Sequence, residues 1–191
     1  MNILWDFDGT LFDTYPAYTR ILKEVLGEKA EYEEIFSQLK ISFTNAFGHY
    51  NLEEEQIAYV RKMARSLKPH DLQPFPGVKD VLKRAGCNVI MTHKEREDVL
   101  AILEHHNMSS LFADMVAGDD GYPRKPHKAS YEYLHGKKSI DLAIGDRELD
   151  ILPAKELGIR TCLFQNSTPG ADYYLSRYED FDTVIGWEKF K

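Results

Sequence analysis

Residues 3–15 read ILWDFDGTLFDTY, an apolar run that changes abruptly into a polar turn. An apolar run ends in two aspartates, Asp6 and Asp8, and a Gly-Thr pair follows them. Two carboxylates this close repel each other, and each resists burial because a charge loses its hydration when it leaves water. The apolar run predicts a short strand over Asn2–Asp6, and some feature of the fold must offset the cost of the two aspartates that follow it.

Strand-like and helical patterns alternate along the second part of the chain. Short apolar runs predict strands at 87–91, 115–117, 142–144 and 160–164, and the segments between them have helical periodicity. We expect a last edge strand over Thr183–Ile185. This alternation is typical of a mostly parallel sheet that helices cover on both faces, which is an α/β fold.

Residues 15–76 follow a different pattern. Helical periodicity recurs at 15–26, 31–39, 42–50 and 53–67, with no convincing strand between these segments. The stretch LKPHDLQPFPGV at 67–78 contains three prolines and a glycine, which is typical of a linker. We therefore predict a core domain formed by 1–14 and 77–191, with a helical domain inserted at 15–76.

Length and composition limit which classes of protein are possible. The 191 residues suffice for one sizeable core and a small second lobe, and the formal net charge of −7 disfavours a general nucleic-acid binder. No apolar run approaches the roughly 20 residues that span a bilayer. The N-terminus lacks a secretory pattern, and Cys87 and Cys162 lie in apolar segments. We expect a cytoplasmic protein with reduced thiols, no nucleic-acid or membrane partner, and a monomeric or weakly dimeric state.

Polar residues follow four of the expected strands. Open parallel sheets bind their ligands at the carboxyl ends of the strands. In chain order, the residues at these ends are Asp6 and Asp8, Thr92 and His93, Lys125, and Asp146 and Asp150. Although they are far apart in sequence, the sheet would bring them into one crevice.

The chemistry of this set points to phosphoryl transfer. Crowded carboxylates favour a hard divalent cation with oxygen ligands, and Mg²⁺ fits best. A lysine, a hydroxyl and backbone N–H groups suit a phosphate, and an aspartate can attack phosphorus. Each residue also has a structural interpretation, such as a turn for Asp6 and Asp8 or a helix cap for Thr92. Four strand ends with the right residue types in order favour the functional interpretation.

The motifs together resemble those of the haloacid dehalogenase-like hydrolase superfamily, nearest its phosphoglycolate phosphatase-like branch. DFDGTLFDT at 6–14 is similar to the first motif, DxDGT, and IGDRELD at 144–150 to the fourth, GDxxxD. Thr92 in VIMTHK and Lys125 in RKPHKASYEYL are similar to the second and third. The resemblance runs from the first strand to about Phe164. It implies a Rossmann-like core and identifies the insertion as a small helical cap that closes over the crevice.

The resemblance also implies roles for the four aspartates. Asp6 would be the nucleophile and a metal ligand. Asp8 would be the general acid and base, and would offer its backbone carbonyl to Mg²⁺. Asp146 would be the main remaining ligand, and Asp150 would lie behind it or bind the metal through water.

The remaining motif residues would handle the phosphate. Thr92 and the backbone N–H of His93 would hold the phosphoryl oxygens, and Lys125 would offset the charge of Asp6 and of the phosphate. The third motif of the family often reads KPxP, whereas this chain has Lys128 at the second proline. Arg124 and Lys128 therefore compete with Lys125 for this role, and we favour Lys125 because it directly precedes Pro126.

Single positions separate the branches of the superfamily. Its dehalogenases and phosphonatases lack the second aspartate, so Asp8 favours a phosphatase. Mutases of the β-phosphoglucomutase type carry a histidine twelve residues after the nucleophile, where this chain has Tyr18. We expect a Mg²⁺-dependent phosphatase that hydrolyses a small phosphorylated metabolite, phosphoglycolate-like or a sugar phosphate, through an aspartyl-phosphate. The alternatives are a sugar phosphomutase and a binding or regulatory member with little turnover.

Overall fold

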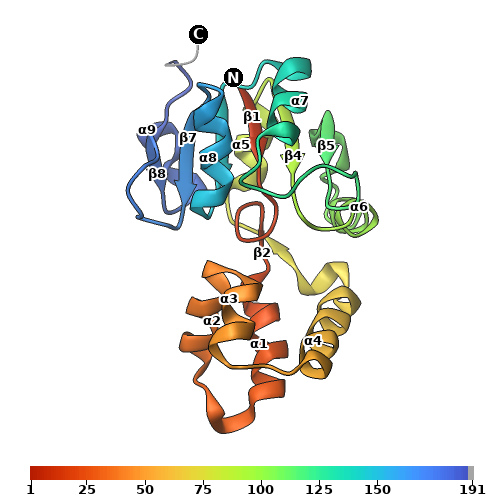
Figure 1. The fold of residues 1–191 in the computed structure, drawn as a ribbon. Helices are drawn as coiled ribbons and strands as arrows, with labels where there is room; N and C mark the ends of the chain where they lie inside the picture. Colours follow the sequence, from red (N-terminus) through yellow and green to blue (C-terminus); the bar gives the residue numbers. More distant parts are fainter. Residues whose placement is uncertain (189–191) are drawn as a thin grey trace. The chain divides into compact units, whose positions relative to one another are not determined.

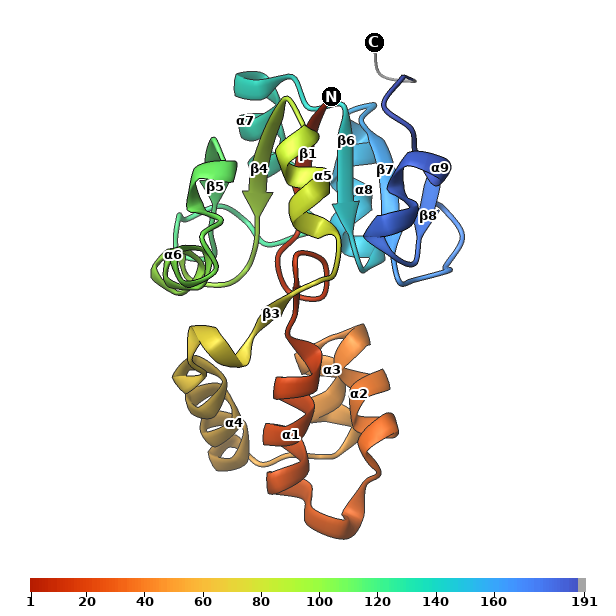
Figure 2. The same ribbon diagram turned by 180° about the vertical axis from the view of Figure 1, so that it is seen from behind.

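The computed structural model describes residues 1–188, and the chain divides into two compact units. Unit 1 comprises Met1–Phe12 and Pro74–Lys191, and unit 2 comprises Asp13–Gln73. Figures 1 and 2 show that unit 1 contains a sheet with helices, whereas unit 2 consists of helices. Unit 2 is therefore an insertion into the chain of unit 1.

Unit 1 is built on one six-stranded sheet whose neighbouring strands are all parallel. The strands in spatial order are β5 (Asp114–Val116), β4 (Cys87–Met91), β1 (Asn2–Trp5), β6 (Leu142–Gly145), β7 (Arg160–Phe164) and β8 (Tyr173–Leu175). The central strand is β1, in which Ile3 pairs with Asn88 on one side and Leu142 on the other. The expectation of a Rossmann-like parallel α/β sheet is confirmed.

Helices lie on both faces of this sheet. They are α5 (Val78–Arg84), α6 (Arg96–His105), α7 (Ala129–Lys138), α8 (Glu148–Glu156) and α9 (Phe181–Val184). Figures 1 and 2 show α7 and α8 over one face and α5 over the other. Leu4 of β1, Leu134 of α7 and Ala154 of α8 belong to one buried cluster. Because helices cover both faces, β1 is a continuous apolar run rather than an alternating one.

The opposite face of the central strands buries a polar pair. The indole N–H of Trp5 donates to Oδ1 of Asn88 at 2.9 Å, and the side-chain amide of Asn88 donates to the carbonyl of Leu82 at 2.9 Å. Buried polar groups are costly unless they are hydrogen-bonded. These bonds therefore explain how an asparagine is accommodated in the middle of β4.

The expectation of an edge strand over Thr183–Ile185 is wrong. Residues 181–184 form the short helix α9, and β8 is the edge strand beside β7. The β-branched residues at 183–185 favour a strand locally. However, Phe181 and Ile185 are four positions apart and both buried, and the N–H of Ile185 donates to the carbonyl of Phe181 at 2.9 Å. Burial of one helical face thus overrides the local propensity.

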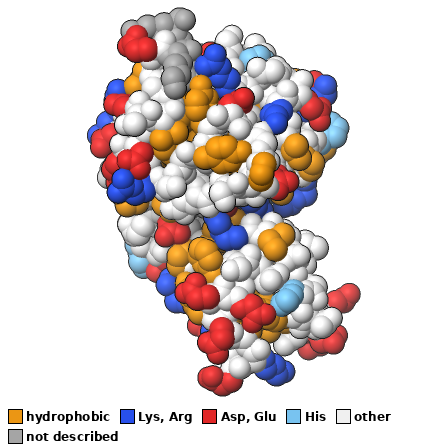
Figure 3. Space-filling view, turned by 90° about the vertical axis from the view of Figure 1, so that its left-hand side faces the viewer, with side chains coloured by type: hydrophobic (Ala, Val, Ile, Leu, Met, Phe, Trp, Pro, Cys, Tyr) orange, Lys and Arg blue, Asp and Glu red, His pale blue; other side chains and the backbone are white. Residues whose placement is uncertain are grey.

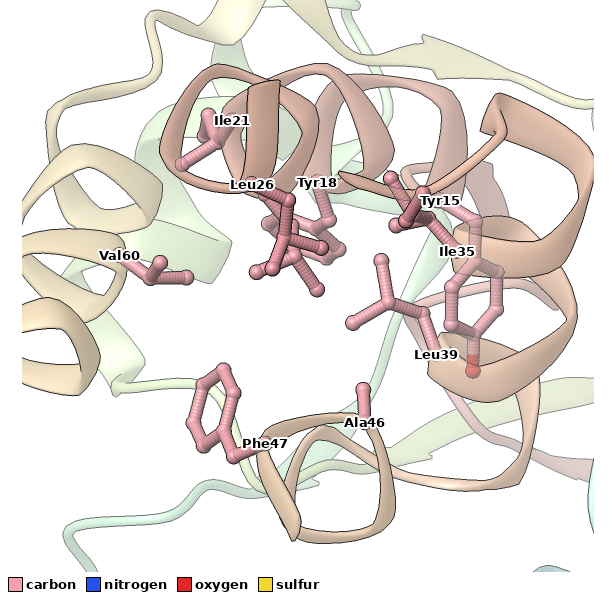
Figure 4. Packing of buried hydrophobic residues seen from close by; sticks show 11 residues of the cluster. Tyr15, Tyr18, Ile21, Leu26, Ile35, Leu39, Ala46, Phe47 and Val60 are labelled. Carbon is pink, nitrogen blue, oxygen red and sulfur yellow. The ribbon is translucent and has the colours of Figure 1, made fainter. Parts of the chain in front are cut away.

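Unit 2 packs four helices around its own hydrophobic core. They are α1 (Tyr15–Leu26), α2 (Tyr32–Ile41), α3 (Phe43–His49) and α4 (Glu54–Ser66), with short 3₁₀ turns at Gly27–Lys29 and Pro69–Asp71. Figure 4 shows Tyr18, Leu39, Phe47 and Val60, one from each helix, pointing toward a common centre. Buried apolar residues from all four helices therefore form the core of unit 2.

The chain passes between the two units at two neighbouring places. The two-residue strands β2 (Phe12–Asp13) and β3 (Gln73–Pro74) pair with each other. Just inside unit 1, the N–H of Phe75 donates to the carbonyl of Leu11 at 3.0 Å. The insertion therefore leaves unit 1 and returns to it at adjacent points.

The surface carries charges of both signs. On the face drawn in Figure 3, Lys and Arg side chains are interspersed with Asp and Glu, and hydrophobic side chains lie among them. Within residues 1–188, no helix has the length and apolar character needed to cross a membrane.

Candidate active site

The sheet fixes the first residue beyond each of two central strands. The N–H of Asp6, directly after β1, donates to the carbonyl of Ile144 at 2.9 Å. The N–H of Thr92, directly after β4, donates to the carbonyl of Val116 at 3.0 Å. Asp146 directly follows β6. Asp6, Thr92 and Asp146, which the sequence predicted to follow strands, therefore lie at the same edge of the sheet.

The loop after β1 folds back on itself. The carbonyl of Phe7 accepts the N–H of Phe12 at 3.1 Å, and the N–H of Gly9 donates to the carbonyl of Phe12 at 2.8 Å. Gly9 has a φ of 80°, a conformation that glycine adopts without strain. The hydroxyl of Thr10 then donates to Oδ2 of Asp6 at 3.2 Å. The Gly-Thr pair thus makes the tight turn and orients the Asp6 carboxylate.

Three aspartates form a buried acidic group. One carboxylate oxygen from each of Asp6, Asp146 and Asp150 lies within 4.8 Å of the other two. These residues are 3%, 0% and 2% exposed, so bulk water does not screen their repulsion. Asp8 lies outside this group, in the loop after β1, and its side chain is 24% exposed. Asp8 therefore has the access to solvent that the other three lack.

The close approach of Asp150 depends on a glycine. A Cβ at Gly145 would lie 2.2 Å from Cβ of Asp150, so no side chain fits at the end of β6. Asp150 lies in the first turn of α8, where its Oδ2 accepts the N–H of Arg147 at 3.0 Å. This bond satisfies a free N–H at the helix start and holds the Asp150 carboxylate toward the strand ends.

Lys125 is the cation that bridges the acidic group. Its Nζ lies 2.5 Å from Oδ1 of Asp6 and 2.6 Å from Oδ1 of Asp150, and the residue is 6% exposed. Lys128, by contrast, pairs with Glu132 at 3.1 Å through a side chain that is 44% exposed. Arg124 is exposed. Of these three competing cations, Lys125 is the one that contacts the carboxylates.

The pKa values describe how charge is shared within this group. Burial, and then the charge of Asp150, raise the pKa of Asp6 to about 7, although Lys125 lowers it. Burial also opposes ionisation of Asp150, but Lys125 and Arg147 outweigh it and the pKa of Asp150 is lowered. Burial would lower the pKa of Lys125, but Asp150 and Asp6 together raise it. The lysine therefore stays charged, and Asp6 takes up a proton more readily than an ordinary aspartate.

This charge balance is a test of whether a metal fits. Lys125 contacts two of the three buried carboxylates, and Nε of Arg147 lies 3.7 Å from Asp146 and 3.9 Å from Asp150. Two cations therefore face three carboxylates, whose oxygens are the donors that hard cations prefer. Both oxygens of Asp150 already accept hydrogen bonds, from Lys125 and from the N–H of Arg147. The arrangement fits a divalent cation held through Asp6 and Asp146, with Asp150 behind them.

The strand end after β4 contributes a compact turn. Thr92 is buried, and its hydroxyl oxygen accepts the N–H of Lys94 at 3.1 Å. Nζ of Lys94 lies 3.6 Å from Oδ1 of Asp8. The ring of His93 accepts the N–H of Lys125 through Nε2 at 3.0 Å. The sequence pointed to the backbone N–H of His93, and the contact of its ring is an addition.

The structure adds three residues that the sequence did not single out. The side-chain amide of Asn166 donates to the carbonyl of Asp146 at 2.8 Å. The hydroxyl of Tyr131 donates to the carbonyl of Asp150 at 2.8 Å, and the hydroxyl of Tyr178 donates to the carbonyl of Thr10 at 2.9 Å. Asn166 lies two positions after β7, so the strand-end rule could have found it. The two tyrosines come from segments outside the strand ends, and no local pattern marks them.

Three comparisons with known proteins agree with this arrangement. The family model described as haloacid dehalogenase-like hydrolase matches residues 3–164. A pyrophosphatase PpaX from Halalkalibacterium halodurans is 27% identical, over 96% of this chain and 91% of the relative. A phosphoglycolate phosphatase from Aliivibrio fischeri is 25% identical, over 82% of this chain and 80% of the relative.

A solved structure shows the same architecture. A hydrolase from Streptococcus pneumoniae superposes with a TM-score of 0.68 and 28% identity, covering 86% of this chain and 92% of that one. The matched region contains the strand-end residues described above, from Asp6 to Asp150. The family and branch expected from the motifs are confirmed. The chain belongs to the haloacid dehalogenase-like hydrolase family, and it is a hydrolase of the phosphatase kind on the phosphoglycolate phosphatase-like branch.

Proposed function

We propose that this enzyme is a Mg²⁺-dependent phosphatase that hydrolyses a small phosphorylated metabolite through an aspartyl-phosphate on Asp6. The observation that carries the proposal is the contact of one buried lysine, Lys125, with two members of a buried group of three aspartates. A fixed cation beside a partly compensated carboxylate is the arrangement that phosphoryl transfer requires. The phosphatase relatives add support for a phosphorylated substrate, phosphoglycolate-like or a sugar phosphate.

Mg²⁺ would be held by Asp6, Asp146 and the backbone carbonyl of Asp8. Asp150 would support the site from behind, because both of its oxygens are engaged with Lys125 and Arg147. When bound, Mg²⁺ supplies positive charge that neutralises the phosphoryl oxygens during transfer.

The chain's own residues divide the remaining chemistry. A carboxylate oxygen of Asp6 attacks phosphorus while the ester P–O bond breaks, and the leaving oxygen takes a proton from Asp8. Asp8 then removes a proton from water, which attacks the aspartyl-phosphate. This second step releases inorganic phosphate and restores Asp6.

The residues around the phosphate hold it during both steps. We assign the phosphoryl oxygens to the hydroxyl of Thr92 and the backbone N–H of His93, while Lys125 offsets their charge. The roles of Asp8, Thr92 and His93 rest on their places after β1 and β4. Lys94, 3.6 Å from Asp8, keeps a positive charge beside the proton-transferring group.

We further propose that unit 2 acts as the cap that selects among substrates, because it is an insertion with a core of its own. A cytoplasmic location is also part of the proposal, and it is supported by the two free cysteines, Cys87 and Cys162.

The test is hydrolysis of p-nitrophenyl phosphate with Mg²⁺, with EDTA, and with Mg²⁺ restored after EDTA. We expect EDTA to abolish turnover, Mg²⁺ to restore it, and Asp6→Asn to lower kcat by at least about 10³-fold. The matched control is Asp80→Asn, which changes an exposed aspartate at the start of α5 and leaves kcat unchanged. Activity that survives Asp6→Asn or EDTA would refute the mechanism.

The same preparation separates the alternatives. A mutase interconverts sugar phosphates, depends on a bisphosphate primer and releases little inorganic phosphate. A binding or regulatory member binds a phosphorylated ligand but does not turn it over. A panel of phosphorylated metabolites, scored by phosphate release, therefore identifies the substrate and decides between these classes.

A further inference from the structure

The segment that carries Lys125 lies outside the regular elements. Residues 117–128 connect β5 to α7 without helix or strand, so Lys125 is not held by a sheet ladder or a helix. Nevertheless its Nζ reaches two buried carboxylates from different parts of the chain. Something must therefore fix the main chain of Lys125 relative to the strand ends.

The main chain of Lys125 is bonded to the ring of His93. The N–H of Lys125 donates to Nε2 of His93 at 3.0 Å, across 32 positions of sequence. His93 follows β4 directly after Thr92, so its starting point is set by the sheet. This bond joins the loop after β4 to the loop after β5.

The backbone at His93 is itself held tightly. The N–H of Gly118 donates to the carbonyl of Lys94 at 2.8 Å. A Cβ at Gly118 would lie 2.2 Å from the carbonyl oxygen of His93, so the two loops are in backbone contact there. The ring of His93 therefore projects from a well-fixed base.

The bond also defines the chemical state of the ring. A ring nitrogen accepts an N–H only when it carries no proton, so Nδ1 holds the proton of a neutral imidazole. Burial and the neighbouring cations Lys125, Arg124 and Arg147 lower the pKa of His93 to about 3, although Asp150 opposes them. The ring is therefore neutral near pH 7, as the bond requires.

We propose that His93 is a positioning residue that acts through Lys125. Its ring holds the main chain of Lys125 at the place from which Nζ contacts both Asp6 and Asp150. The two contacts then connect the loop after β4, the segment between β5 and α7, the end of β1 and the first turn of α8 in one chain of hydrogen bonds. The proposal rests on the proposed function, because Lys125 must serve phosphoryl transfer for its position to affect turnover.

A matched pair of variants tests the hydrogen bond. His93→Gln keeps an acceptor at a similar reach, whereas His93→Leu keeps bulk without an acceptor. A small misplacement of a catalytic group costs up to about 100-fold. We therefore expect His93→Leu to lower kcat for p-nitrophenyl phosphate about 10- to 100-fold and His93→Gln to stay within about 3-fold of the wild type. Equal losses in both variants, or wild-type kcat in His93→Leu, would overturn the proposal.

A second experiment separates positioning from a loss of folding. The effect of His93→Leu is measured again in a Lys125→Met background, with thermal unfolding of every variant as the folding control. A residue that acts through Lys125 has little effect on the residual kcat once Lys125 is gone, because coupled residues are not additive. An undiminished loss of kcat in that background would show that His93 does not act through Lys125.

A third readout does not need activity. The ¹⁵N signals of the His93 ring report which nitrogen carries the proton, and His93→Gln identifies these signals by removing them. We expect a neutral ring protonated on Nδ1 at pH 7. An imidazolium, or a proton on Nε2, would overturn the proposal even in an active enzyme. If the wild type has a neutral ring protonated on Nδ1 but no phosphatase activity, the hydrogen bond to Lys125 stands and the proposed function is refuted.

Discussion

At the scale of single residues, Lys125 balances charge that the fold buries. It contacts Asp6 and Asp150, and removing one partner of a buried ion pair leaves the other uncompensated, at a cost of about 3–5 kcal/mol. We expect Lys125→Met to lower the free energy of unfolding by that amount without Mg²⁺, as measured by urea denaturation. Lys128→Met, which alters an exposed ion pair, is the control and should stay within about 0.5 kcal/mol.

The same prediction has an internal check. Asp150→Asn in the Lys125→Met background removes one of the unpaired charges, so it should recover part of the lost stability. Mg²⁺ should also stabilise Lys125→Met, because a ligand that binds the folded state shifts the unfolding equilibrium. A double variant less stable than Lys125→Met would show that charge repulsion is not the cause.

His93 gives stability a dependence on pH. Its pKa is about 3 in the folded protein and about 6.5 in an unfolded chain, so the unfolded state binds more protons between these values. This contribution to stability is complete above pH 6.5 and is lost as the pH falls toward 3. We expect the free energy of unfolding of His93→Gln to fall less steeply than that of the wild type between pH 6.5 and 4. His70→Gln, at an exposed position, should follow the wild type.

Residue types at strand ends were readable from the sequence, but their partners were not. The rule that ligands bind at the carboxyl ends of strands selected Asp6, Lys125 and Asp150, and in the structure Lys125 contacts both aspartates. It could not select Tyr131, whose hydroxyl donates to the carbonyl of Asp150 at 2.8 Å. A sequence pattern shows which residue follows a strand. A hydrogen bond between distant segments depends on how those segments pack, and the sequence pattern does not show that.

At the scale of elements, the junction of β6 and α8 is limited by space. A Cβ at Gly145 would lie 2.2 Å from Cβ of Asp150, and overpacking typically costs about 1–3 kcal/mol. We expect Gly145→Ala to destabilise the protein at least this much in urea denaturation and to lower turnover, because Asp150 must move. Gly136→Ala in α7 meets open space and should stabilise by about 0.5–1 kcal/mol. A neutral Gly145→Ala would show that α8 can shift freely.

Elements with strong periodicity were predictable, and marginal ones were not. Three elements have the expected bounds: the strands Cys87–Met91 and Arg160–Phe164 and the helix Tyr15–Leu26. The two-residue strands β2 and β3 were missed, because a pair this short has no periodicity to detect. At Thr183–Ile185 a local pattern was present but misleading. The β-branched residues there favour a strand, whereas burial of Phe181 and Ile185 on one face stabilises a helix.

At the scale of the whole molecule, the insertion of unit 2 interrupts the chain of unit 1 but not its core. The buried cluster that includes Leu4, Leu134 and Ala154 lies entirely in unit 1, and the cluster around Leu39 and Phe47 lies in unit 2. A change from strand-helix alternation to helices alone predicted two such parts. Each unit therefore has the hydrophobic core that independent folding requires.

This separation predicts that unit 1 folds without unit 2. Because the N–H of Phe75 donates to the carbonyl of Leu11 at 3.0 Å, the ends of the insertion are adjacent, and a short Gly-Ser linker can replace residues 13–73. We expect this shortened protein to unfold in one cooperative thermal transition with the circular dichroism of an α/β fold. The control replaces residues 95–108, which contain α6 with the buried Val99 and Leu103, and should not fold. A shortened protein without a cooperative transition would show that the core of unit 1 depends on unit 2.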